Sequence, residues 1–198
     1  MNATLEEANT RGKTENFTLI AVHNDKFLTP ELNRAITDLI RQGRAMIGKV
    51  FVLTRPSKEP QLSEDQVRIY RSEEVKDNDK YILTGWYLGT CVFNTFRNLL
   101  RRMPTHKICA IHISLDTVED EVLQIADIDS LKKNIRFKEI VDKYYGEALK
   151  RGDVTVFLDG EIYKTSGGTD FCTTIHFYSS SQSFLKTSAP LNGTGVLK

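Results

Sequence analysis

Two histidines lie in runs that alternate between apolar and polar residues, which is the pattern of a strand. His112 is followed two positions later by Ser114, and His176 by Tyr178, with Thr174 two positions before it. Residues two apart in a strand share a face, so each imidazole is expected to lie beside a hydroxyl group. Two imidazoles in one groove can act as general base and general acid on a phosphodiester, while hydroxyls hold the phosphate.

The arrangement resembles the two-histidine phosphoesterases, whose hallmark is a pair of His-x-Ser/Thr motifs on strands. The resemblance implies catalysis by His112 and His176 on a nucleotide or RNA phosphodiester, with Ser114 and Tyr178 at the hydroxyl positions. This chain departs from the family because Tyr178 stands where the second Ser or Thr is expected. The alternative is that two unrelated histidines fall on strands. A catalytic pair requires both imidazoles to line one open groove.

Basic side chains form a second group of candidates, because clustered cations bind phosphate. They gather at the end of one predicted helix and at the start of the next: Arg97, Arg101, Arg102 and Lys107, then Lys132, Lys133 and Arg136. If these ends meet in space, the patch would attract phosphate on RNA or on a lipid headgroup. The alternative is two ordinary solvated helix faces, since the acids Glu139 and Asp142 lie close to the second group.

Composition indicates an ordinary globular protein of one domain. The chain has 198 residues, of which 40% are hydrophobic and 27% charged. Lys and Arg total 27 against 26 acidic residues, so the net charge is +1 and no bulk attraction to nucleic acid or membranes is expected.

The cysteines predict a location inside the cell. Cys91, Cys109 and Cys172 are an odd number, lack CxxC spacing and each lie in an apolar run. This pattern favours buried thiols in a reducing compartment, and no secretory signal is recognisable at the N-terminus. The predicted location is the cytoplasm.

The motifs that anchor metal or cofactor chemistry are missing from the sequence. It contains no GxxxxGK[ST], HExxH, GxSxG or GxGxxG. The acidic pair Asp127 and Asp129 lacks the glycine and the terminal glutamate of a calcium loop. We therefore expect no cofactor and no metal site, and the sequence favours a protein that is not an enzyme.

Hydrophobic periodicity predicts the helices and strands on which these candidate residues lie. The expected elements are strands over 17–22 and 47–53 with a helix over 30–42 between them, a short strand over 67–70, a helix over 81–103, a strand over 108–115, a helix over 128–151 and three strands within 154–180. Asp159-Gly160 is a strong signal for a tight hairpin turn. The prediction is a single α+β domain, with helices packed on a mainly antiparallel sheet and a C-terminal helix-plus-meander.

Three segments are expected to lie outside the packed core. Residues 1–15 are polar and predict a flexible N-terminal arm. Residues 55–80 are rich in Pro, Ser and charged side chains, which predicts an exposed excursion. Residues 181–198 have little to bury and predict a flexible tail. The predicted domain therefore spans residues 16–180.

The order of these elements resembles that of rhabdovirus matrix proteins. In that family a polar arm precedes a strand, a helix and a strand, and a later strand leads through an acidic connection, here 116–127, to a helix and a closing hairpin. The resemblance covers most of residues 16–180 and consists of element order. The chain departs from the family because it lacks a Lys-rich arm and a PPxY motif, and because the 81–103 helix is extra.

The matrix-protein resemblance implies a non-enzymatic structural protein of virion assembly. Its partners would be further copies of itself, nucleoprotein or RNA, and the anionic inner face of the host membrane. Self-association would use residues 55–80 or the polar arm. Two other hypotheses stay open: the phosphoesterase, and a ligand-binding fold with an apolar cavity under the 81–103 helix.

Overall fold

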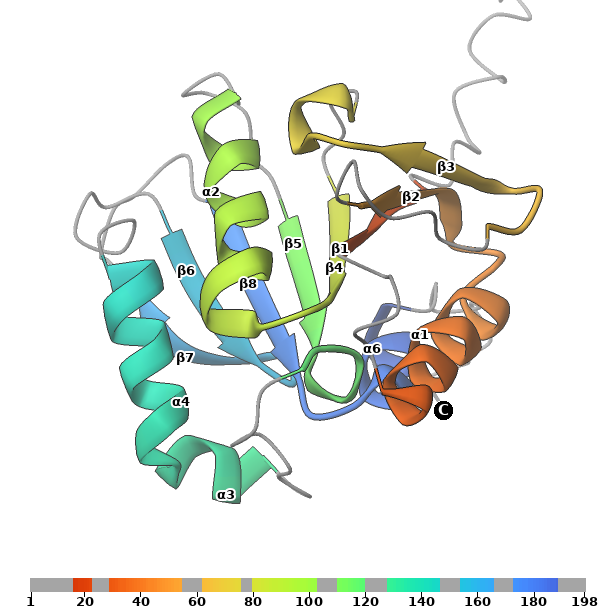
Figure 1. The fold of residues 1–198 in the computed structure, drawn as a ribbon. Coiled ribbons are helices and arrows are strands. Elements are labelled where there is room, and N and C mark those ends of the chain that lie inside the picture. The colour runs from red at the N-terminus through yellow and green to blue at the C-terminus, as the bar shows by residue number, and fades with distance from the viewer. Residues whose placement is uncertain are drawn as a thin grey trace, which may run out of the picture.

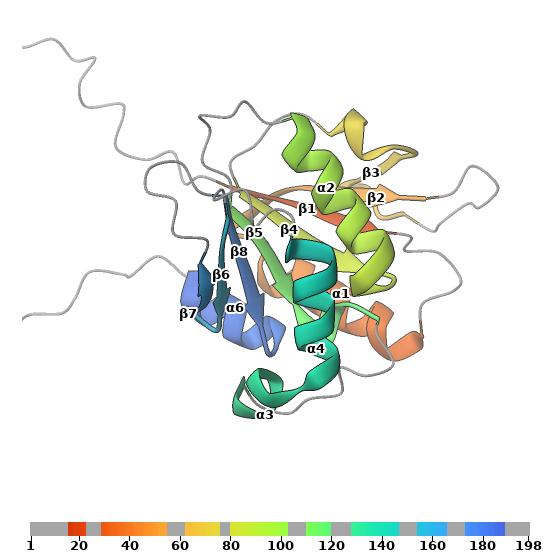
Figure 2. The ribbon, with the colours of Figure 1, turned by 90° about the vertical axis from the view of Figure 1, so that its left-hand side faces the viewer.

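An eight-stranded sheet covered by helices on both faces forms the protein (Figures 1 and 2). The computed structural model describes the following residues: 16–22, 29–54, 62–75, 80–102, 110–119, 128–146, 154–165 and 173–188. The strand order is β3-β2-β1-β4-β5-β8-β6-β7. The chain is a single α+β domain, as the sequence predicts.

The strands are β1 (Phe17–Val22), β2 (Ile47–Leu53), β3 (Gln66–Ile69), β4 (Lys80–Gly85), β5 (Ala110–Ser114), β6 (Val154–Leu158), β7 (Glu161–Thr165) and β8 (Thr173–Tyr178). The helices are α1 (Pro30–Gln42), α2 (Phe93–Arg102), α3 (Ile128–Lys133), α4 (Ile135–Ile140) and α6 (Ser181–Ser188). Short helical turns are η2 (Ser72–Glu74), η3 (Leu88–Val92), η4 (Leu115–Thr117) and η5 (Val141–Tyr145).

Strand direction differs from the prediction, because the sheet is mainly parallel. Six of the seven strand pairs are parallel, and among the described strands β6 and β7 alone run antiparallel. Their turn is the predicted one, with φ of 42° at Asp159 and 89° at Gly160. β8 does not complete a meander; it lies parallel between β5 and β6. Alternation along a strand reports which face is buried, and it carries no information on direction.

The predicted unit of strand, helix and strand at the start of the chain is confirmed. All six residues of β1 are buried, because β1 lies between β2 and β4 and helices cover both faces. Thr29 caps α1 by accepting a hydrogen bond of 3.2 Å from the Leu32 backbone N–H, and Pro30 occupies the first turn. β1 and β2 pair in parallel, as a crossover through a helix requires.

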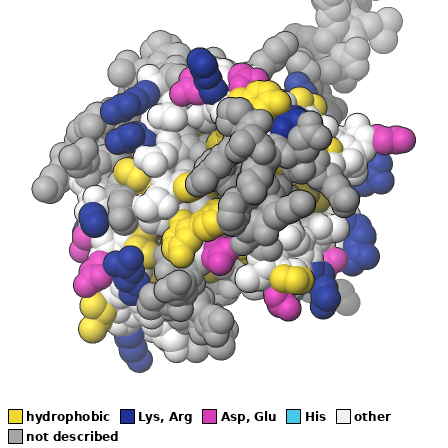
Figure 3. Space-filling view, viewed as in Figure 1, with side chains coloured by type: hydrophobic (Ala, Val, Ile, Leu, Met, Phe, Trp, Pro, Cys, Tyr) yellow, Lys and Arg dark blue, Asp and Glu magenta, His cyan; other side chains and the backbone are white. Residues whose placement is uncertain are grey.

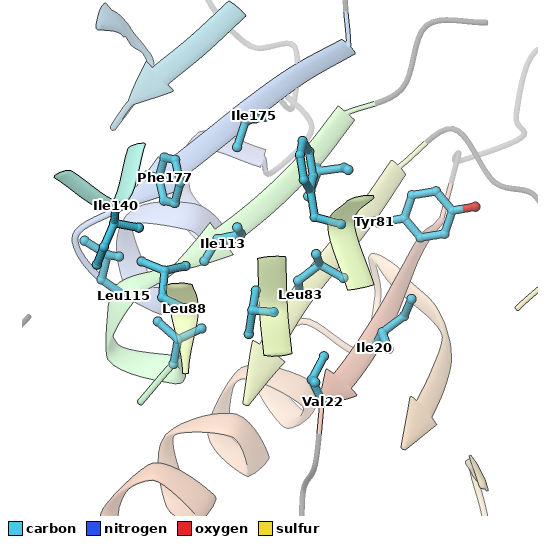
Figure 4. Packing of buried hydrophobic residues seen from close by; sticks show 14 of the residues in the cluster. Ile20, Val22, Tyr81, Leu83, Leu88, Ile113, Leu115, Ile140, Ile175 and Phe177 are labelled. Carbon is cyan, nitrogen blue, oxygen red and sulfur yellow. The ribbon is translucent and has the colours of Figure 1, made fainter. Parts of the chain in front are cut away.

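The helices divide into two layers. The first layer is α2 with η3 and α4 with η5, and the sheet surface under it is called the α2/α4 face (Figures 2 and 4). Its core includes Ile20, Leu83, Ile113, Ile175, Phe177, Leu88, Phe96, Phe137 and Ile140. The second layer is α1 with α6, over what is called the α1/α6 face. Its core includes Phe17, Leu19, Ile82, Tyr178, Leu39 and Phe184.

Two of the predicted helices differ from those observed. The first part of the 81–103 prediction is strand β4, which lies between β1 and β5, and the helical segment begins only at Leu88 after the break at Gly85. The 128–151 prediction is interrupted at Asn134, whose side chain caps α4 by accepting a hydrogen bond of 2.9 Å from the Phe137 backbone N–H. Of this predicted helix, residues 147–151 lie outside the described part of the chain.

The predicted tail contains an ordered helix. Residues 181–188 form α6, so the expectation of a flexible segment is wrong for this part, and the packed domain extends beyond residue 180. Phe184 is fully buried, and one buried aromatic ring anchors the helix although its neighbours are polar. The 1–15 arm, residues 55–61 and residues 189–198 lie outside the described residues.

Within the described ranges, no helix combines the length and the hydropathy that a bilayer crossing needs.

Candidate functional site

His112 and His176 lie side by side on the α1/α6 face of the sheet. They are partners in the register of β5 and β8, with ring centroids 4.6 Å apart and ring planes 8° from parallel. Phe157, the next partner along on β6, stacks on His176 with the same spacing of 4.6 Å and a 6° angle. We call these three residues the ring stack.

Each imidazole of the ring stack has a hydroxyl partner. His112 Nδ1 lies 2.9 Å from Tyr178 Oη, and His176 Nε2 lies 2.9 Å from Thr174 Oγ1. Ser114 is level with Tyr178 in the register, but its Oγ has no hydrogen-bond partner among the described residues. The residues of the predicted catalytic group are therefore brought together on one face.

Burial controls the protonation of this group. Desolvation lowers the pKa of His112 well below its usual range, and the charges of His176 and Lys80 lower it further. Burial lowers the pKa of His176 to about 4. It raises the pKa of Tyr178 to about 12, with the Ser188 hydrogen bond opposing the rise. Both imidazoles are neutral at pH 7, where a general acid needs an imidazolium.

Helix α6 closes the ring stack from the side of His112. Phe184 packs against that imidazole with ring centroids 5.6 Å apart, and against Phe17 and Tyr178 at 5.4 Å each. As a result His112 is only 7% exposed. The two imidazoles are close enough to contact one phosphate, but they stack face to face, with His112 under a helix and His176 half-buried beside it, instead of lining an open groove.

The first group of predicted basic residues lies on α2. Arg97 and Arg101 are exposed on the second half of this helix. α2 follows β4 and leads to β5, so its C-terminal end lies at the edge where the parallel strands begin (Figure 1). The side chain of Arg102 and the whole of Lys107 lie outside the described residues.

The second group lies at the other edge of the sheet, on α3 and α4. α3 follows β5 and therefore starts where the parallel strands end (Figures 1 and 2). Lys133 is exposed, whereas Lys132 donates a hydrogen bond of 2.6 Å to Glu161, and Arg136 pairs with Glu139 at 3.4 Å. The described members of the two basic groups therefore lie toward opposite ends of the parallel strands, and Figure 3 shows Lys and Arg side chains scattered over this side of the molecule.

A second site lies where β4 and β5 part at their carboxyl ends. Backbone pairing between them runs from Lys80–Ala110 to Ile82–His112 and then stops, although both strands continue. Beyond this point Gly85 pairs instead with Val118. Both β1–β4 and β5–β8 stay paired to the ends of their strands, so the separation is confined to this one pair.

Residues with unpartnered polar atoms lie on the segments that border this separation. Three buried side-chain atoms have no hydrogen-bond partner within the described part of the chain, namely Thr84 Oγ1, Ser114 Oγ and Glu119 Oε2. Thr84 and Ser114 lie at the carboxyl ends of strands β4 and β5, on the side of the sheet that faces α1 and α6. Glu119 is placed next to them by its backbone N–H, which donates a hydrogen bond of 2.9 Å to the Gly85 carbonyl. We call Thr84, Ser114 and Glu119 the fork. A buried polar group without a partner is costly and calls for an explanation.

The fork lies next to the switch point of the sheet, where the chain stops adding strands on one side of β1 and starts adding them on the other. After β1 the chain adds β2 and β3 on one side, and then returns to add β4 and β5 on the other. In open sheets of this kind, ligands bind outside the carboxyl ends of the strands at such a switch point. The backbone N–H of Leu88 donates to the Glu119 carbonyl at 3.2 Å, so the helical segment after β4 begins at the fork.

Sequence reasoning missed the fork, and one signal could have revealed it. Gly85 and Gly89 flank a short aromatic connection between a buried strand and a helix. Tyr87 in this connection has φ of 49°, a backbone region that residues other than glycine rarely adopt. The signal was hidden because the whole of 81–103 was assigned to one helix.

Other chemistry-bearing groups are few in the described residues. Cys91 is a free, half-buried thiol, while Cys109 and Cys172 lie outside the described ranges. No three His, Cys, Asp or Glu side chains within the described ranges lie close enough to hold a metal ion. Comparisons with protein-family models, with curated proteins and with solved structures found no match to this chain.

Proposed function

We propose that the protein binds a small ligand with neighbouring hydroxyl groups, such as a sugar or the ribose of a nucleotide, at the fork. One observation carries the proposal. All three of the unpartnered buried side-chain atoms in the described residues belong to residues at, or just after, the carboxyl ends of β4 and β5, next to the switch point between β1 and β4. That is where sheets of this architecture bind ligands.

The chemistry of the three side chains selects the ligand class. The Glu119 carboxylate can only accept hydrogen bonds, so it favours a ligand that donates from hydroxyl groups. The hydroxyls of Thr84 and Ser114 both donate and accept, which matches the hydroxyls of a sugar ring. A phosphate on the same ligand would meet the N-terminal end of the segment from Leu88 to Arg102, where the helix dipole is positive.

Two of the three hypotheses from the sequence, the phosphoesterase and the matrix protein, receive less support. Catalysis by His112 and His176 would require an open groove, and the imidazoles are instead stacked on each other and neutral, with His112 covered by Phe184 of α6. A role in assembly stays a prediction. Exposed apolar side chains at Leu62, Val67 and Tyr70 lie in the segment predicted for self-association, and they are compatible with that role.

Replacing Thr84 by valine tests whether its hydroxyl is truly unpartnered. The change removes a buried hydroxyl and keeps the branched shape, so we expect the free energy of unfolding of the ligand-free protein to rise by about 1 kcal/mol. Urea unfolding monitored by circular dichroism measures it. Thr95→Val is the control, because the buried Thr95 hydroxyl donates to the Cys91 carbonyl at 3.1 Å and its removal should destabilise. Equal losses in both variants would contradict an unpartnered Thr84.

Replacing Glu119 by glutamine tests ligand binding directly. Isothermal titration calorimetry with adenosine, ribose 5-phosphate, ribose and inorganic phosphate should detect binding of at least one of the ribose-containing compounds. We expect Glu119→Gln to weaken that binding by roughly 10-fold or more, because a charge-assisted hydrogen bond is lost. Glu73→Gln, at an exposed residue of η2, should bind like the unchanged protein. If no ribose compound binds, or if Glu119→Gln binds equally well, the proposal is wrong.

A further inference from the structure

Helix α6 is tied down at its first residue by a carboxylate from another part of the chain. Asp116, in η4, accepts hydrogen bonds from the Ser181 backbone N–H at 2.8 Å and from the Ser181 hydroxyl at 2.8 Å. The Ser180 hydroxyl accepts a further bond of 3.2 Å from the Ser183 N–H. These contacts satisfy donors in the first turn of the helix, which would otherwise lack partners.

At its other end α6 is connected to the ring stack. Ser188, the last residue of the helix, is hydrogen-bonded to Tyr178. The Tyr178 hydroxyl also contacts His112 Nδ1 at 2.9 Å. Between the two ends, Phe184 covers the same imidazole. α6 is therefore linked to His112 by one hydrogen-bonded chain and one ring contact.

The charged groups around the imidazoles all oppose protonation of His112. His176 stacks on one face of this ring. Lys80, on β4, acts on it as a cation, with Nζ 5.8 Å from the centre of the Phe17 ring that packs against His112. The neighbours Phe157 on β6 and Phe184 on α6 are uncharged. Among the described residues, no carboxylate is hydrogen-bonded to either imidazole.

A proton on the buried His112, or on the half-buried His176 stacked on it, would therefore place a cation beside a second imidazole and Lys80, with no hydrogen-bonded carboxylate among the described residues. α6 is the element that can relieve this. It has eight residues, of which only Ser181 and Phe184 are fully buried, whereas β5 and β8 are held in the sheet on both sides. Short elements with few buried contacts open before the rest of a fold.

We propose that α6 is an acid-released cover, which leaves the sheet when the His112–His176 pair is protonated while the rest of the domain stays folded. Release lets water reach the imidazoles and uncovers the aromatic surface formed by Phe17 and Tyr178. This inference does not depend on ligand binding at the fork.

The direction of the pH dependence follows from the histidines. Burial lowers the pKa of His176 to about 4 and lowers the pKa of His112 as well, both below that of a free histidine, about 6.5. Because the closed form binds protons less readily than the open form, closure is favoured above about pH 6.5 and is lost as the pH falls toward 4. The cover is thus closed at neutral pH.

Hydrogen–deuterium exchange of the full chain at pH 7 and pH 4.5, corrected for intrinsic rates, tests the proposal. We expect amides of residues 181–188 to lose at least about 10-fold in protection at pH 4.5, while amides of α1 keep theirs. His176→Phe keeps a stacking ring and removes one titrating group, so it should retain more of the protection at pH 4.5. His112→Phe should do the same, and His23→Gln, elsewhere in the chain, should behave like the unchanged protein.

Two outcomes would overturn the acid-released cover. In the first, α6 is equally protected at both pH values. In the second, protection falls equally in the unchanged protein and in both phenylalanine variants, so that the histidines are not the cause. Asp116→Asn separates the cap from the histidines. Asp116→Asn should lower the amide protection of α6 at both pH values, while the further fall in protection from pH 7 to pH 4.5 stays as large as in the unchanged protein.

Discussion

Replacing Gly85 by alanine is expected to lower the free energy of unfolding by about 3 kcal/mol or more. A Cβ at this position would lie 2.1 Å from the Val22 carbonyl oxygen and 2.8 Å from the Val22 backbone nitrogen. These atoms cannot move aside, because Val22 and Gly85 are partners in the β1–β4 ladder and the Trp86 N–H donates to the same oxygen at 2.9 Å. The φ of +111° adds strain for any residue with a Cβ.

Gly160→Ala is a matched control for this change. Gly160 also has a positive φ, of 89°, but nothing lies within 4 Å of the position its Cβ would take. Gly160→Ala should therefore lower the free energy of unfolding by only about 1 kcal/mol, the cost of placing a residue with a Cβ at positive φ. Urea unfolding of both variants measures the difference. Equal losses would show that the close approach of β4 to β1 contributes nothing.

Replacing Phe137 by alanine should cost about 3 to 5 kcal/mol of the free energy of unfolding. Phe137 is fully buried on α4 and packs edge-on against Phe177 of β8 at 5.2 Å and against Tyr163 of β7 at 6.0 Å. Removing the ring leaves a cavity between the helix and the sheet, which the surrounding elements can only partly fill.

The opposite side of α4 supplies the control for Phe137→Ala. Ile135 is 74% exposed, so Ile135→Ala should change the free energy of unfolding by less than about 0.5 kcal/mol. Urea unfolding again measures both. If the two variants lose similar amounts, α4 does not pack on the sheet through the side that carries Phe137.

Local signals in the sequence correctly predict those parts of the fold that depend on neighbouring residues. Thr29 and Pro30 mark the start of α1, and Asp159-Gly160 marks the β6–β7 turn, because capping and turn geometry involve only a few consecutive residues. The apolar side of the predicted 128–151 helix is also confirmed at Phe137 and Ile140.

Features that depend on the pairing of strands far apart in the sequence cannot be predicted from such local signals. The insertion of β8 between β5 and β6 depends on which strand edges remain free, and periodicity does not report that. The same holds for the fork. Thr84, Ser114 and Glu119 belong to separate segments, and the separation of β4 from β5 that they border is a feature of strand pairing, which periodicity does not report.

The predicted histidine pair shows both the strength and the limit of this reasoning. Alternation placed His112 and His176 on strands, and the structure puts them on one face at contact distance. Burial lowers the pKa of His112, and one of the rings that bury it is Phe184, which lies in a segment predicted to be a flexible tail. One buried ring among polar neighbours carries too weak a periodic signal to predict a helix.

The position of β8 also affects the order in which the protein can be assembled during synthesis. β8 (Thr173–Tyr178) joins β5 to β6, so the β6–β7 hairpin has no partner in the sheet until residues 173–178 have left the ribosome. Until then the free edges of β5 and β6 are exposed, and exposed edges of nascent chains invite pairing with other molecules.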